Sequence, residues 1–92
     1  MKTHFYDNAW HAGTGAELSA TSSTNNQEIW RGNAAAQEQV NAAIESARAG
    51  FKTWSRTPYT EREAIVKRYQ EVLKSRQDEI AATIALDVGK PL

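Results

Sequence analysis

Apolar side chains recur along part of the chain with the period of an α-helix. Between about residues 35 and 56 they form one stripe at i, i+3, i+4, i+7, i+11 and i+14, which predicts an amphipathic helix. The stripe consists of Val40, Ala43, Ile44, Ala47, Phe51 and Trp54. Gly50 lies inside the pattern at a cost of about 1 kcal/mol relative to alanine, so we expect close packing there. Pro58 disfavours α geometry at Thr57 and predicts that the helix ends before it.

A second helical pattern covers residues 61–88. Thr60 and Glu63 match a capping box, in which the hydroxyl accepts from the Glu63 N–H and the Glu63 side chain reaches back to Thr60. The apolar stripe of this segment consists of Ile65, Tyr69, Val72, Leu73, Ile80 and Ile84. Arg76 interrupts the stripe, so we expect a kink or break near residues 75–78.

The end of the second helical pattern carries strong stop signals. Ser75 or Asp78 can cap the helix that restarts after the break. At the far end of that helix, Gly89 suits the C′ position of the final turn. Pro91 cannot continue a helix, and Lys90 can interact with the negative helix end.

The first part of the chain predicts a tight hairpin at about residues 3–12. Asp7 and Asn8 make a suitable two-residue turn, because both tolerate positive φ. Such a turn pairs Tyr6 with Ala9, Phe5 with Trp10, and His4 with His11. The aromatic pair then shares one face and the histidines the other. A metal site needs a third ligand, which is not nearby, so a half-exposed cross-strand histidine pair is the favoured interpretation.

Two further short strands are predicted at residues 17–22 and 28–32. The polar run between them is typical of a turn. Gly13-Thr14-Gly15 is another turn, and it resembles the start of a dinucleotide-binding fingerprint. Leu18 stands where the third glycine is needed, and no strand-turn-helix context surrounds the turn, so phosphate binding is disfavoured.

These elements predict an α+β chain with a hairpin, a second pair of short strands and an antiparallel helical pair. Ninety-two residues allow at most one small domain. Alanine is the commonest apolar residue, so large core side chains are few, and without cysteine no disulfide can stabilise the fold. We therefore expect the apolar faces to pack against something outside these residues, in preference to economical packing against one another.

The charge balance argues against nucleic-acid and anionic membrane partners. Eleven basic and eleven acidic residues cancel, and they are interspersed. Arg48, Lys52 and Arg56 lie near Trp54, but they fit a solvated cationic face near a helix C-terminus better than a nucleic-acid patch. No apolar run has the length of a signal peptide or a membrane span, so we expect a soluble cytoplasmic protein.

An ordered set of motifs resembles the N-terminus of NAD(P)-dependent aldehyde dehydrogenases. The set consists of the hairpin ending in Trp10, the strand at 29–32, the segment 40–54, Arg62, and Asp87-Val88-Gly89-Lys90-Pro91. Each motif alone is weak, but their order and spacing are specific. The stretches 29–35, 47–58 and 64–73 are similar to the branch of the family that oxidises a succinylated glutamate semialdehyde in bacterial arginine degradation. The turn at 23–28 departs from the family pattern, because it lacks the usual proline and glycine.

The resemblance implies that residues 1–92 are the start of the NAD-binding domain of an α/β dehydrogenase, with no complete domain. The implied parent oxidises an aldehyde with NAD or NADP and needs a thiolate, a base and a nicotinamide. The chain has no cysteine, so we expect no catalytic residue, no cofactor-binding residue and no activity in these residues alone. The implied partner is the remainder of the dehydrogenase chain.

The resemblance also implies a monovalent cation site in the parent. Backbone carbonyls hold the ion, one from Asp87 and one from about Ser22. The third ligand is missing, so we expect no bound ion in the fragment, and Asp87 equally fits a solvated carboxylate at a helix end. One alternative stays open: a free-standing helical interaction module, in which a homo-oligomer buries the two stripes between copies.

Overall fold

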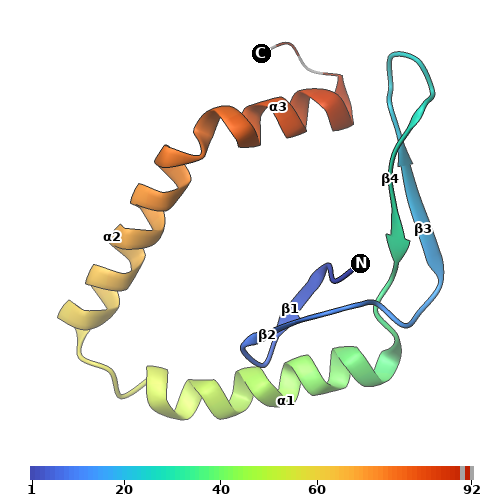
Figure 1. Cartoon of the computed structure of the whole chain (residues 1–92). Coiled ribbons are helices and arrows are strands. Elements are labelled where there is room, and N and C mark those ends of the chain that lie inside the picture. Colours follow the sequence, from blue (N-terminus) through green and yellow to red (C-terminus); the bar gives the residue numbers. More distant parts are fainter. Residues whose placement is uncertain (90, 92) are drawn as a thin grey trace. The chain divides into compact units, whose positions relative to one another are not determined.

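The computed structural model describes residues 1–89 and residue 91 (Figure 1). Its elements follow the order β1, β2, β3, β4, α1, α2 and α3, with two two-stranded sheets, which confirms the predicted α+β composition. The chain divides into two compact units. The first comprises Met1–Ala20 and Trp30–Ser55, and the second comprises Thr21–Ile29 and the chain from Arg56 onward.

The N-terminal hairpin has the predicted register. Strand β1 (His4–Tyr6) pairs antiparallel with β2 (Ala9–His11), with His4 opposite His11, Phe5 opposite Trp10 and Tyr6 opposite Ala9. The turn residues Asp7 and Asn8 have φ values of 49° and 57°. Two successive positive φ values match the twist of a tight hairpin, which is the reason these residue types predict it.

Aromatic contacts reinforce both faces of this hairpin. Phe5 and Trp10 meet edge to face with ring centroids 5.3 Å apart, and each remains 58% exposed. On the other face, Tyr6 stacks on the His11 ring at 3.9 Å. The His11 ring nitrogen Nε2 lies 3.2 Å from the Tyr6 carbonyl oxygen, so this histidine is engaged within the hairpin.

The second sheet pairs β3 (Glu17–Thr21) with β4 (Glu28–Asn33). The Gly15 N–H donates to the Ala34 carbonyl and the Ser22 N–H donates to the Gln27 carbonyl, both at 2.7 Å, so the two strands run antiparallel. Glu17 and Arg31 form an ion pair across the two strands. Neither strand pairs with a further strand among the described residues.

Helix α1 (Gln37–Trp54) starts two residues later than residue 35, the predicted beginning. The N-cap position is Ala36, which has no side-chain oxygen for capping. The Gln39 side chain accepts from the Ala36 N–H at 3.1 Å instead. The expected close packing at Gly50 is wrong for the described chain, because no atom lies within 4 Å of the position that a Cβ would take.

Helix α2 (Tyr59–Ser75) starts two residues earlier than predicted, and the capping box at Thr60 is wrong. The N-cap is Pro58, whose φ of −55° suits a helix start. Its carbonyl accepts from the Glu61 and Arg62 N–H groups, both at 3.1 Å. Thr60 therefore lies inside the first turn of α2, so its hydroxyl does not occupy the N-cap position.

The predicted break falls at Arg76, between α2 and α3 (Gln77–Val88). The Arg76 backbone has φ −110° and ψ 15°, outside regular helix geometry. Helix α3 ends at Gly89 with a φ of 73°, and the Gly89 N–H donates to the Ala85 carbonyl at 2.9 Å. Gly89 thus closes the helix in the left-handed conformation, as predicted. The prediction for Lys90 lies outside the described residues.

No apolar side chain of the described residues is buried, whereas Ser22 is only 4% exposed. The amphipathic stripes on the helices therefore remain largely solvent-facing. Within the same residues, no helix combines the length and hydropathy needed to cross a membrane. The predicted antiparallel pairing of the two helical segments involves one segment from each unit, and it stays a prediction.

Candidate functional site

The side-chain amide of Gln39 joins the loop after the hairpin to the start of α1. Its Oε1 accepts from the Thr14 N–H at 2.9 Å, the Thr14 hydroxyl at 3.0 Å and the Ala36 N–H at 3.1 Å. Its Nε2 donates to the Ala12 carbonyl at 2.8 Å and lies 3.5 Å from the Tyr6 hydroxyl. The role of Gln39 was not predicted from the sequence. The available signal was a glutamine three positions after the N-cap, where a capping box places Glu or Gln.

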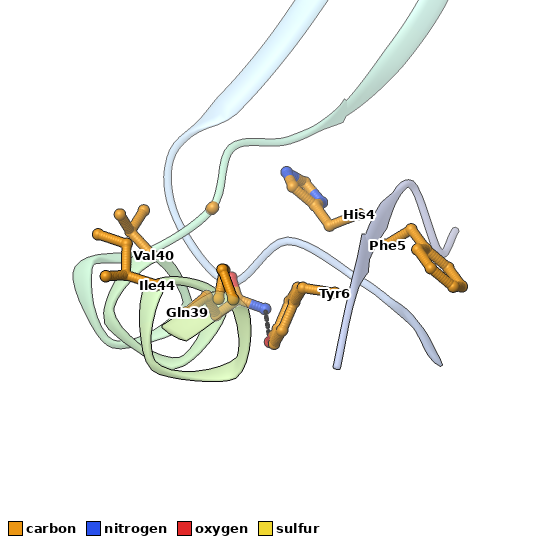
Figure 2. Close-up of a pocket in the computed structure, with 9 residues that line it drawn as sticks. His4, Phe5, Tyr6, Gln39, Val40 and Ile44 are labelled. Atoms are coloured by element: carbon orange, nitrogen blue, oxygen red, sulfur yellow. Dashed lines mark hydrogen bonds between the residues drawn. The ribbon is translucent and has the colours of Figure 1, made fainter. Parts of the chain in front are cut away.

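Beside Gln39, an open apolar groove lies between β1 and α1 within the first unit (Figure 2). Its volume is about 370 Å³. The lining residues are His4, Phe5, Tyr6, Ala35, Gln39, Val40, Ala43, Ile44 and Ala47. Figure 2 shows Gln39 and Tyr6 joined by their hydrogen bond, with Val40 and Ile44 together on the helix. The wall of the groove on α1 is aliphatic, and the Gln39 amide is already used in hydrogen bonds within the fold. The groove therefore suits hydrophobic packing rather than catalysis.

The glycine turn at residues 13–15 brings two backbone segments close together. A Cβ on Gly13 would meet the backbone of Asn33 and Ala34, and one on Gly15 would lie 2.9 Å from the Ala34 carbonyl oxygen. Glycine is therefore required for close backbone approach. The Thr14 N–H between them already donates to Gln39.

The two predicted cation ligands lie in the second unit. Asp87 is in the last turn of α3 with an exposed side chain. Ser22 begins the turn between β3 and β4, where its carbonyl oxygen accepts from the Asn26 N–H at 2.9 Å. The Ser22 hydroxyl lies 2.9 Å from the Thr24 hydroxyl. The turn that begins at the buried Ser22 is thus stabilised by hydrogen bonds of its own.

The segments that contain these two positions meet through their neighbours. A Cβ on Gly89 would contact the Ser23 hydroxyl oxygen, so this turn touches the end of α3. No group of three metal-ligating side chains occurs in the part of the chain that the structure describes. The cation site at Asp87 and Ser22 would use backbone carbonyls, and it stays a prediction that rests on the resemblance.

A solvent-exposed ion pair stabilises the break between α2 and α3. Arg76 donates from Nε to Glu79 Oε2 at 3.0 Å and from Nη2 to Oε1 at 2.6 Å. The hydrogen bonds, followed by the guanidinium charge, lower the pKa of Glu79. The same hydrogen bonds, followed by the carboxylate charge, raise the pKa of Arg76. A carboxyl group with a lowered pKa stays ionised near neutral pH, so Glu79 keeps the charge that pairs with Arg76.

The amino-acid sequence of this chain is similar to sequences of known proteins. Residues 10–92 match the sequence model of the aldehyde dehydrogenase family. An N-succinylglutamate 5-semialdehyde dehydrogenase from Serratia proteamaculans is 45% identical over 87 residues, covering 95% of this chain and 18% of that protein. Proteins of the same name from Chromobacterium violaceum and Vibrio cholerae are 41% and 39% identical, over 100% and 98% of this chain and 19% of each protein. The chain thus spans about a fifth of the length of the curated relatives it matches.

Proposed function

The chain belongs to the aldehyde dehydrogenase family, and from that premise we propose that it is the N-terminal segment of an N-succinylglutamate 5-semialdehyde dehydrogenase. The whole enzyme oxidises N-succinyl-L-glutamate 5-semialdehyde to N-succinylglutamate with NAD or NADP. The observation that carries the proposal is 39–45% identity to three proteins of that name over nearly the whole chain.

In this proposal, residues 1–92 are a scaffold within the cofactor-binding domain. Oxidation of an aldehyde through a covalent intermediate needs a thiolate, and the chain has no cysteine. The Thr14 N–H of the glycine turn already donates to Gln39, which argues against a dinucleotide phosphate at this turn. The nucleophile, the general base and the cofactor contacts therefore belong to the rest of the enzyme.

Expression of the complete reading frame that encodes these residues tests the proposal. We expect reduction of NAD or NADP that depends on the succinylated semialdehyde. We also expect at least a tenfold loss in kcat/KM for the aldehyde without the succinyl group, because polar groups that recognise it are then left unpaired. A stop codon after Leu92, or a folded protein that prefers the unsuccinylated aldehyde, would contradict it.

The exposed stripes favour a second candidate, a free-standing module that associates through its helices. Phe51 is 66% exposed on α1, and Ile65 and Tyr69 on α2 are also exposed. Soluble proteins rarely leave such side chains uncovered in a row. Analytical sedimentation of the 92-residue chain over a range of concentrations tests this candidate. A compact monomer that unfolds cooperatively at every concentration would eliminate it.

A further inference from the structure

We draw no further inference here: the strongest candidate, the Arg62 side chain near the start of α2, has a buried Nε without a hydrogen-bond partner among the described residues, but nothing in the structure shows which group would pair with it.

Discussion

Gln39 and Thr14 are 25 positions apart in the chain, and one amide oxygen of Gln39 accepts both the backbone N–H and the hydroxyl of Thr14. The same oxygen accepts the Ala36 N–H, so the start of α1 and the loop after the hairpin share one acceptor. Because one oxygen accepts three hydrogen bonds, the Gln39 side chain links the start of α1 to the loop after the hairpin.

Replacement of Gln39 is expected to release the Thr14 loop. Gln39→Ala removes the shared acceptor, and the loss of hydrogen bonds worth about 0.5–1.5 kcal/mol each should speed hydrogen exchange of the Thr14 amide about tenfold. Gln39→Glu retains an acceptor oxygen and should keep most of the protection. NMR exchange measurements on the 92-residue chain give the rates. Gln37→Ala, which loses only a bond to Asn41, is the control, and unchanged exchange in Gln39→Ala would contradict the assignment.

Alanine should have opposite effects at two glycines. Gly89 has a φ of 73° and lies against the Ser23 hydroxyl, so Gly89→Ala should destabilise the end of α3 by about 1–2 kcal/mol. Gly50 is inside α1 with open space around it, so Gly50→Ala should stabilise that helix by about 1 kcal/mol in the 92-residue chain. Circular dichroism and amide exchange of each helix measure the changes. A change of the same sign at both positions would show that the local conformations differ from those described.

The break between α2 and α3 should become less ordered in acid. The pKa of Glu79 is lowered first by its hydrogen bonds with Arg76 and then by the Arg76 charge. A carboxyl group with a lowered folded pKa contributes stability that is present above its unfolded pKa and is lost as the pH falls through the folded value. NMR titration of the Glu79 carboxyl follows this. In Arg76→Gln the pKa should rise to the ordinary glutamate range, and a titration unaffected by this substitution would rule out the pair in solution. The effect on stability is small, because both groups are exposed.

The 92-residue chain alone should not oxidise aldehydes. Without a thiol it cannot form the covalent intermediate, and the groove offers hydrophobic packing instead of a nucleophile and base. The measurement is reduction of NAD or NADP by the pure chain with the succinylated semialdehyde, beside the complete protein as positive control. Turnover that persists through repeated purification would remove the basis of the fragment proposal.

Several local features follow from residue types because their causes are local. Asp7 and Asn8 tolerate positive φ and so predict the hairpin register. Arg76 disrupts an apolar stripe, and Gly89 accepts the left-handed conformation, so the break and the helix end were also predicted. The capping box at Thr60 failed because Pro58, two residues earlier, supplies both a suitable φ and a free carbonyl. Pro58 and Thr60 are both signals for a helix start, and the capping-box motif alone does not show which of the two begins the helix.

The amino-acid sequence by itself determined the helical and strand segments, the turn residues, the family resemblance and the absence of a thiol nucleophile. These depend on backbone preferences and residue types within a few positions of one another. Only the tertiary structure decided that Gln39 binds Thr14, that β1 and α1 enclose a groove, and that Ser23 meets Gly89. Such contacts join residues far apart in the chain, and they depend on how the backbone folds back in space, which no local pattern specifies.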